Sequence, residues 1–218
     1  MTLPSIAVLD YGMGNRRSVE KALERVGARP RITRQADDVR AADGLVVPGV
    51  GAFPEAMRRL RELTLDGLVR ERLDAGGPVL GICLGMQLLF ERSSEHEGAE
   101  GLALLPGEVT RLETGGLRLP HIGWNLVRFQ RPSSLTAGLP EACAFYHVHT
   151  FAARPADEGD VLGVAEYGEP FASVVARDPL FGVQFHPEKS SAHGLQMLRN
   201  FVELCRARVA SPVQPAAA

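Results

Sequence analysis

Short apolar runs alternate with amphipathic stretches over residues 5–93, and this alternation constrains the fold more than any other feature of the sequence. The runs SIAVL, RPRIT, GLVV and PVLGI each have the length and composition of a strand. Apolar residues then recur at the spacing of one helix face at Val19, Ala22, Leu23 and Val26. We expect further helices over 53–63, 65–75 and 84–93. Strands that alternate with helices through short loops favour a parallel sheet covered on both faces.

The pattern changes after about residue 100, where alternating and β-branched runs replace the helical spacing. These runs predict strands within 107–113, 117–129, 142–155, 161–168, 171–179 and 180–187. A closing helix is expected over 190–209. The predicted fold class is α/β, with a mostly parallel central sheet flanked by helices and an additional β-rich antiparallel portion. We expect one domain over 1–209 and a disordered tail at 210–218.

Composition argues against several classes of function. The chain has 218 residues and a formal net charge of −2, so we expect no nucleic-acid partner and no membrane surface. Its cysteines, Cys83, Cys143 and Cys205, are too few and too scattered for a disulfide framework, which favours the reducing cytoplasm. The sequence has neither a basic leader nor an apolar run of the roughly 20 residues that span a bilayer, so we expect no signal peptide and no membrane span.

The segment GICLG places Cys83 between Gly81 and Gly85, after a predicted strand and before a predicted helix. This is the cysteine form of the nucleophile elbow, a sharp strand-to-helix turn that presents its central side chain. Glycines allow neighbouring backbone to approach such a turn, and a helix N-terminus favours the thiolate. A lone cysteine is more often a structural residue, but this context favours a nucleophile.

A thiol nucleophile requires a base and a group that orients the base. In the run LFGVQFHPEKS, an apolar strand leads into His186, followed by Pro187 and Glu188. Alternation along an extended chain puts His186 and Glu188 on one side, where the carboxylate can hold one imidazole nitrogen. We therefore predict Cys83 as nucleophile, His186 as acid–base and Glu188 as the orienting carboxylate.

Backbone amides at the ends of two predicted strands are candidates for an oxyanion hole. The glycines of the segment PGVG, residues 48–51, can turn an amide inward at Val50 or Gly51. The amide of Leu84 directly follows the predicted nucleophile and can face the same point. Loss of one such donor costs roughly 3–4 kcal/mol of transition-state stabilisation.

Together, the motifs PGVG, GICLGMQ and HPE resemble those of the class I, or triad, glutamine amidotransferases. The resemblance implies that glutamine is hydrolysed through a γ-glutamyl thioester at Cys83, with no cofactor. It also implies that Gln87 and Gly51 help to hold the substrate glutamine.

Further motifs look like those of the glutaminase subunits of imidazole glycerol phosphate synthase, which act in histidine biosynthesis: DYGMGNRRSVEKAL, PGVGAFPEAM, LPHIGWN, FYHVHTF and GVQFHPEKS. That family docks as a heterodimer on a (β/α)8 cyclase subunit, which uses the ammonia to make imidazole glycerol phosphate and an aminoimidazole carboxamide ribotide. The resemblance implies that His149 and Thr150 line the glutamine pocket. It places Asn15, Trp124 and Lys189 at the partner interface.

Two positions, Arg16 and His147, depart from this family's usual pattern, which more often has an aliphatic and an apolar residue there. His147 and His149 share one face of a strand, but no further ligand follows at a suitable spacing, so we expect no metal. The segment YGMGN lacks the third glycine of a dinucleotide-binding loop.

Other functions are weighed against this prediction. One is the glutaminase subunit of another synthase, of the anthranilate or aminodeoxychorismate type, which the motifs HIGWN and YGMGN argue against. Another is a different cysteine hydrolase, although the chain order Cys, His, Glu disfavours an α/β-hydrolase. A non-catalytic binding module is disfavoured because all three predicted triad residues are present.

Overall fold

The computed structural model describes residues 2–210 of the chain. The predicted tail at 210–218 falls, apart from Ala210, outside the described residues and stays a prediction. None of the helices within 2–210 combines the length and the apolar character needed to cross a membrane.

A nine-stranded mixed sheet forms the centre of the molecule, in the order β2-β1-β3-β4-β13-β12-β11-β8-β9. The strands from β2 to β13 in this order pair in parallel, and those from β13 to β9 pair in antiparallel. The parallel part comprises β1 (Ser5–Leu9), β2 (Arg29–Thr33), β3 (Gly44–Gly49), β4 (Val79–Cys83) and β13 (Leu180–Val183). The antiparallel part comprises β8 (His121–Phe129), β9 (Ala142–His149), β11 (Val161–Glu166) and β12 (Pro170–Arg177).

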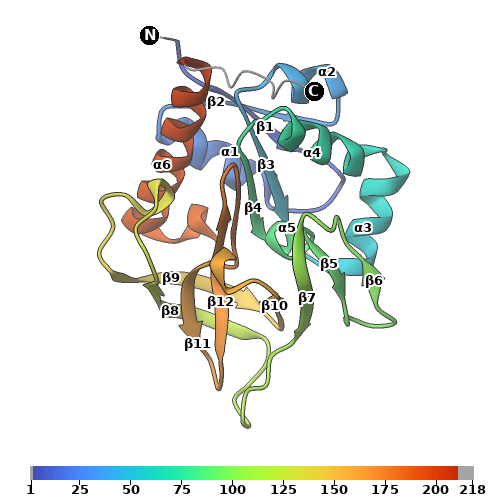
Figure 1. Cartoon of the computed structure of the whole chain (residues 1–218), viewed down its shortest axis with the longest axis vertical. Coiled ribbons are helices and arrows are strands. Elements are labelled where there is room, and N and C mark those ends of the chain that lie inside the picture. The colour runs from blue at the N-terminus through green and yellow to red at the C-terminus, as the bar shows by residue number, and fades with distance from the viewer. Residues whose placement is uncertain (1, 211–218) are drawn as a thin grey trace.

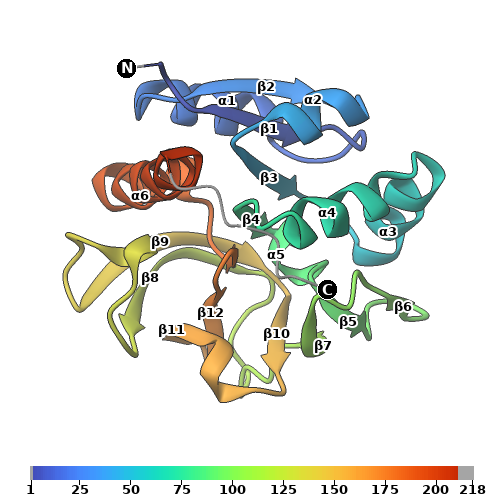
Figure 2. The ribbon, with the colours of Figure 1, turned by 45° about the horizontal axis from the view of Figure 1, so that its top comes forward.

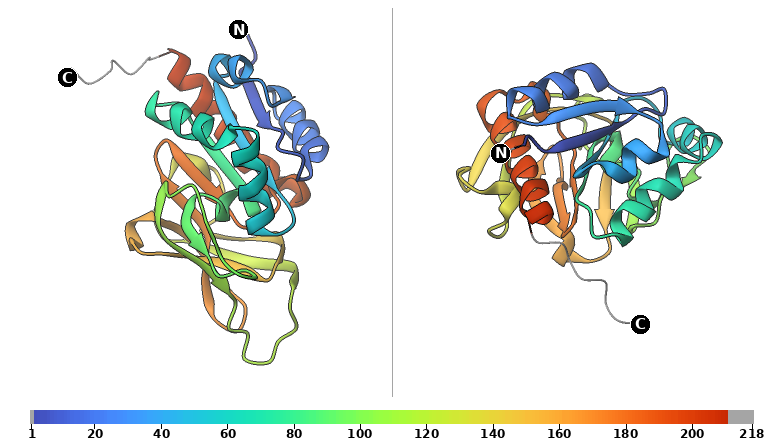
Figure 3. Two further views of the ribbon diagram at one scale, coloured as in Figure 1. Left: turned by 90° about the vertical axis from the view of Figure 1, so that its right-hand side faces the viewer. Right: turned by 90° about the horizontal axis from the view of Figure 1, so that it is seen from above.

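A smaller four-stranded sheet, in the order β10-β7-β5-β6, lies beside the central sheet. Its strands are β5 (Phe90–Ser93), β6 (Ala99–Glu100), β7 (Leu105–Arg111) and β10 (Phe151–Pro155). Figure 1 shows the helices gathered around the parallel strands, with the antiparallel strands and β7 extending below them. The two views of Figure 3 show the same division from other sides. This architecture confirms the predicted fold class.

Helices cover both faces of the parallel strands, as Figure 2 shows for α6 on one side and α3 and α4 on the other. Alternation along β1 creates this arrangement, because Ile6 and Val8 pack in one core with α1 and α6, whereas Ala7 and Leu9 pack in a second core with α2, α3 and α4. The helices are α1 (Arg16–Arg25), α2 (Ala36–Ala41), α3 (Phe53–Glu62), α4 (Leu65–Asp74), α5 (Leu84–Gln87) and α6 (Ser191–Ala210), with short 3₁₀ helices η1 (Ser134–Thr136), η2 (Glu158–Asp160) and η3 (Pro187–Lys189).

The helix predicted over 84–93 is wrong after its first turn. Helix α5 ends at Gln87, and the chain then continues into strand β5. The carbonyl groups of Leu88, Leu89 and Phe90 accept hydrogen bonds from the backbone of residues 102–105, so a turn at 88–89 leads into β5 in place of further helix. All three side chains are buried, so the apolar run fits a strand as well as it fits a helix.

Two further elements differ from the sequence prediction. The run expected as one strand within 142–155 divides at Thr150 into β9 and β10, which belong to different sheets. Helix α2 was not predicted, because its six residues contain only one buried apolar side chain, Val39. The division at Thr150 matters for function, since it places a strand junction next to the end of β4.

Candidate active site

Cys83 lies at the carboxyl end of β4, a strand with partners on both sides, and leads directly into α5. Its backbone has φ 54° and ψ −112°, a region that costs a non-glycine residue about 1–3 kcal/mol. A Cβ atom at Gly81 would approach the Gly85 carbonyl oxygen to 2.6 Å, and one at Gly85 would overlap the Val47 carbonyl oxygen. The two glycines flank the cysteine because this turn leaves no room for side chains.

The imidazole of His186 reaches the cysteine because β13 pairs in parallel with β4, with Val183 beside Ile82. Beyond β13, Pro187 begins the 3₁₀ helix η3, and this tight turn brings Glu188 Oε1 to 2.9 Å from His186 Nδ1. The contact was predicted from strand alternation, but the turn produces it. Ser190 then fixes the position of the turn, since its hydroxyl donates to the His186 carbonyl oxygen at 2.7 Å.

The electrostatics of this group favour a protonated imidazole at His186. Burial lowers the pKa of His186, but the Cys83 sulfur and the Glu188 carboxylate outweigh it and raise that pKa to about 10. The side chains of His186 and Glu188 are almost wholly buried, so water screens the pair little. Helix α5, which follows the cysteine, has only four residues, so the dipole at its N-terminus is weaker than that of the longer helix predicted from the sequence.

Glu188 has a second neighbour that the sequence did not indicate. Asn15 Nδ2 donates to Glu188 Oε1 at 3.3 Å, so the side chain of Asn15 contacts the predicted triad as well as lying near the surface. The other oxygen, Glu188 Oε2, is buried and has no hydrogen-bond partner among the described residues.

A cavity of about 280 Å³ opens over the cysteine, between the β3–α3 loop, the start of α5 and the β9–β10 junction. Its lining includes all the residues predicted for the nucleophile, the base, the oxyanion hole and the substrate pocket: Cys83, His186, Val50, Gly51, Leu84, Gln87, His149 and Thr150. The predicted orienting residue, Glu188, lies behind His186 and does not line the cavity. The remaining lining residues are Glu95, Pro120, Val148, Phe151 and Lys189. Residues from distant parts of the chain are therefore brought together, as the sequence predicted.

Glu95 is a cavity residue that the sequence analysis missed. It follows β5, within a stretch whose preceding residues were expected to be helical, so no local signal pointed to it. Its Oε2 accepts a hydrogen bond from the backbone amide of Phe53, the first residue of α3, at 2.7 Å. Besides His186, the cavity lining therefore contains one acidic side chain, Glu95, and one basic side chain, Lys189.

The loop predicted to carry the oxyanion amides lies against the loop that follows β1. Tyr11 is fully buried, and its hydroxyl donates to the Pro48 carbonyl oxygen at 2.5 Å. Burial raises the pKa of Tyr11, and the charge of Cys83 raises it further, so the hydroxyl stays protonated as a donor. Beyond this anchor, Gly51 has φ +112° and Val50 is exposed. Tyr11 belongs to the DYGMGN motif, and the sequence alone does not indicate this contact.

A cluster of three buried histidines supports one wall of the cavity without holding a metal ligand set. His149 Nδ1 lies 2.9 Å from the Phe151 carbonyl oxygen, and its Nε2 lies 2.9 Å from His121 Nδ1. Because the carbonyl can only accept, His149 Nδ1 carries the proton and His121 donates to His149. Burial lowers the pKa of His149 to about 3, so the ring is neutral. Within residues 2–210, no group of three His, Cys, Asp or Glu side chains has an arrangement that could hold a metal ion.

The two departures from the family pattern have structural partners. The fully buried His147 has its Nε2 2.9 Å from Ser173 Oγ and its Nδ1 3.1 Å from the Phe145 carbonyl oxygen, so both ring nitrogens are hydrogen-bonded. Arg16 forms an ion pair with Asp10 at the start of the loop that carries Tyr11.

The residues predicted for the partner interface differ in their exposure and contacts. Trp124 is 55% exposed and lies on β8 between Ile122 and Leu126, which are 60% and 52% exposed. These three side chains occupy alternate positions of the strand, so they share one face and form an exposed apolar stripe. Lys189 is exposed at the rim of the cavity, and Asn15 packs against Glu188.

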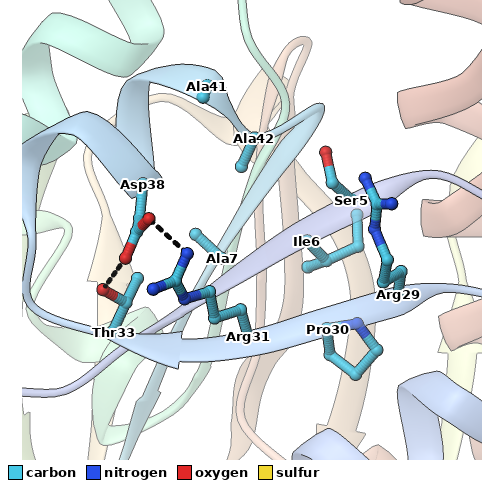
Figure 4. Close-up of a pocket in the computed structure, with 10 residues that line it drawn as sticks. All are labelled: Ser5, Ile6, Ala7, Arg29, Pro30, Arg31, Thr33, Asp38, Ala41 and Ala42. Atoms are coloured by element: carbon cyan, nitrogen blue, oxygen red, sulfur yellow. Dashed lines mark hydrogen bonds and ion pairs between the residues drawn. The ribbon is translucent and has the colours of Figure 1, made fainter.

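A second hollow of about 430 Å³ lies along β1 and β2, beside α2 (Figure 4). It is lined by the first residues of β1, by β2 up to Thr33 and by residues of α2 and its end. Arg31 Nη1 pairs with Asp38 Oδ1 at 2.6 Å within it, and the Thr33 hydroxyl donates to the same carboxylate at 2.7 Å. Ligands of parallel sheets bind at the carboxyl ends of the strands, so the cavity over Cys83 is the candidate active site.

Cys83 on its strained strand–helix turn therefore lies beside the His186–Glu188 pair, which follows the adjacent parallel strand β13. The family model for class-I glutamine amidotransferases matches residues 7–205, and the chain belongs to this family. Solved structures agree at the level of the fold. A putative GMP synthase subunit from Thermoplasma acidophilum has a TM-score of 0.75 at 19% identity, over 96% of this chain and 98% of that one. PurLQS from Thermotoga maritima has a TM-score of 0.72 at 17% identity, over 93% and 99%.

More closely related sequences identify a single group within the family. The chain is 51% identical to imidazole glycerol phosphate synthase subunit HisH of Moorella thermoacetica, over 92% of this chain and 95% of that protein. It is 49% identical to the HisH subunit of Aquifex aeolicus, over 89% and 94%. The chain therefore belongs to the HisH subunits of imidazole glycerol phosphate synthase.

Proposed function

We propose that this chain hydrolyses L-glutamine to glutamate and ammonia through a thioester on Cys83, and supplies the ammonia to a (β/α)8 cyclase subunit in histidine biosynthesis. The observation that carries the proposal is the meeting of Cys83 with the His186–Glu188 pair in one cavity. The names of the relatives support the assignment to imidazole glycerol phosphate synthase.

In the first chemical step, the sulfur of Cys83 attacks the side-chain carboxamide carbon of glutamine. His186 holds the proton of the thiol and donates it to the departing ammonia, and Glu188 keeps Nδ1 of the imidazole occupied at 2.9 Å so that Nε2 is free. The amide of Leu84 and an amide at Val50 or Gly51 stabilise the oxyanion. In the second step, His186 takes a proton from water as the water oxygen attacks the thioester carbon. The bond from that carbon to the sulfur of Cys83 breaks, His186 returns the proton to the sulfur, and glutamate is released.

The charged lining of the cavity suits a free amino acid. Glu95 offers a carboxylate to an α-ammonium group, and Lys189 offers an ammonium to an α-carboxylate. Gly51, Gln87, His149 and Thr150 complete the proposed substrate pocket. A volume of about 280 Å³ is close to the smaller end of ligand pockets and fits one small molecule.

The exposed apolar stripe of Ile122, Trp124 and Leu126 is the surface we assign to the cyclase partner, with Lys189 and Asn15 as polar contacts at its edge. Exposed apolar residues in a row on one strand are typical of an interaction surface, and aromatic anchors are enriched there. The partners form a heterodimer in the cytoplasm. Ammonia released over Cys83 then passes to the partner, which forms imidazole glycerol phosphate and an aminoimidazole carboxamide ribotide.

Two alternatives receive less support. A glutaminase subunit of the anthranilate or aminodeoxychorismate type shares the class-I fold, but the relatives at 49–51% identity carry the HisH name. A different cysteine hydrolase would not require the paired charges of Glu95 and Lys189 in its cavity.

Replacement of the proposed nucleophile tests the function. We expect Cys83→Ala to abolish glutamate release, measured in the presence of the cyclase partner with its nucleotide substrate, without loss of the complex on a sizing column. Cys143→Ala is the matched control, because Cys143 is a buried core residue of β9. Glutamate production by Cys83→Ala at the wild-type rate would refute the assignment of the nucleophile.

A further inference from the structure

Gln184 is a buried polar residue beside the reactive sulfur, and the mechanism above gives it no role. It follows the last residue of β13, and its side chain has no exposure to solvent. Its amide nitrogen, Nε2, lies 3.7 Å from Cys83 Sγ, within hydrogen-bonding distance for sulfur. A buried amide donor without a hydrogen-bond partner is costly. The sulfur of Cys83 is the partner that the structure gives to this N–H, so the contact requires an explanation.

A chain of hydrogen bonds fixes which end of this amide faces the sulfur. Gln87 Nε2 donates to the Phe151 carbonyl oxygen at 2.9 Å and to Gln184 Oε1 at 3.0 Å. The Phe151 carbonyl can only accept, so the nitrogen of Gln87 is directed to it and the second N–H of Gln87 is directed to the oxygen of Gln184. The nitrogen of Gln184 is therefore left to face Cys83.

The surroundings of the sulfur differ for the thiol and the thiolate. The Val148 carbonyl oxygen lies 3.8 Å from Sγ and can accept a hydrogen bond from the thiol only. The N–H of Gln184 can donate to the sulfur, and a donor favours the negatively charged form. His186 and Tyr11 are the titratable groups whose ionisation is coupled to that of the sulfur, with Glu188 behind the imidazole.

We propose that Gln184 is a further catalytic residue, whose amide N–H holds the sulfur of Cys83 in place and stabilises the thiolate. Gln87 acts through it as a positioning residue, because its amide keeps the oxygen of Gln184 turned away from the sulfur. The inference rests on the proposed function, since it takes Cys83 as the nucleophile. It adds a donor to the thiolate that is independent of the His186–Glu188 pair.

Alkylation of Cys83 by iodoacetamide tests this proposal without glutamine or the cyclase, because the reaction rate follows the fraction of thiolate. The rate is measured at pH 7 by mass spectrometry of the peptide that contains Cys83. We expect Gln184→Met, which keeps the volume but removes the donor, to slow alkylation about tenfold, as a shift of one pH unit in the thiolate equilibrium would. Raising the pH restores the rate. The control Gln130→Met, in an exposed loop, leaves the rate unchanged.

Steady-state kinetics of the complex give the second readout. In Gln184→Met we expect kcat for glutamine hydrolysis to fall about tenfold with KM nearly unchanged, because the lost contact is to the nucleophile. If that variant does not fold, Gln184→Glu takes its place, since it retains the oxygen that accepts from Gln87 and replaces the donor. A folded Gln184 variant that is alkylated at the wild-type rate overturns the inference. Failure of the proposed function would appear instead as glutamate release by Cys83→Ala.

Discussion

Substitution of Gly85 by alanine tests the physical reason for the glycines around Cys83. The added Cβ would overlap the carbonyl oxygen of Val47 and would lie 2.8 Å from the carbonyl carbon of the same residue. Val47 belongs to β3, which is paired with β1 and β4 on its two sides. Neither group can move aside, because both belong to the backbone of a central strand.

The expected cost is therefore at the upper end of the range for overpacking, about 3 kcal/mol. For a chain of 150–250 residues, a loss of 1 kcal/mol lowers the melting temperature by about 2–4 °C, so Gly85→Ala should melt about 6–12 °C lower. The strained turn should also shift, which moves the sulfur of Cys83 relative to His186. We expect glutaminase activity to fall at least tenfold at a temperature where the variant is still folded.

Gly67→Ala is the matched control. Gly67 lies within α4, and a Cβ atom there would have no heavy atom within 4 Å outside its own stretch of helix. Alanine in a helix is favoured over glycine by roughly 0.5–1 kcal/mol, so this variant should melt slightly higher with unchanged activity. Thermal melts followed by circular dichroism and a glutamate-release assay measure both effects. A Gly85→Ala protein with wild-type melting temperature and activity would refute the close-approach argument.

The remaining predictions concern the triad and the anchor of the oxyanion loop. Burial lowers the pKa of His186, but Cys83 and Glu188 raise it to about 10, above the value of about 6.5 in an unfolded chain. The imidazolium therefore stabilises the fold fully below about pH 6.5, and this contribution is lost as the pH rises towards 10. We expect the free energy of unfolding, measured in urea, to decline between pH 6 and pH 10 in the wild type. In Glu188→Gln this decline should be smaller by on the order of 1 kcal/mol. An equal decline with pH in the two proteins would contradict the prediction. Tyr11→Phe removes the hydroxyl that donates to the Pro48 carbonyl oxygen at 2.5 Å, and it should lower the free energy of unfolding by about 1 kcal/mol. We also expect kcat to fall by a larger factor than KM changes. An unchanged kcat would show that this hydrogen bond does not position the oxyanion loop.

Much of the site could be predicted because its signals are local. Gly81 and Gly85 mark a turn in the sequence itself, since only glycine tolerates the close backbone contacts found there. His186 and Glu188 stand two positions apart, and the turn after β13 brings them into contact. The predicted contact is present, although it is made by a 3₁₀ helix and not by an extended strand.

The prediction was wrong where distant backbone decides the local structure. Leu88, Leu89 and Phe90 are apolar enough to continue a buried helix, but the chain turns at 88–89 and hydrogen bonds from residues 102–105 pair with this segment. Glu95 was missed for the same reason, because its position over the cavity depends on that strand. No periodicity within the segment contains this information.

The sequence by itself determined the alternating elements of the sheet, the strained cysteine turn and the adjacency of imidazole and carboxylate. These depend on residue size and backbone freedom over a few positions. Only the tertiary structure decided that Gln184, 101 positions beyond Cys83, faces the sulfur, and that Tyr11 holds the loop at Pro48. Parallel pairing of β4 with β13 and of β3 with β1 and β4 sets those distances. A buried amide or hydroxyl shows its partner only after the strands that carry it have been aligned.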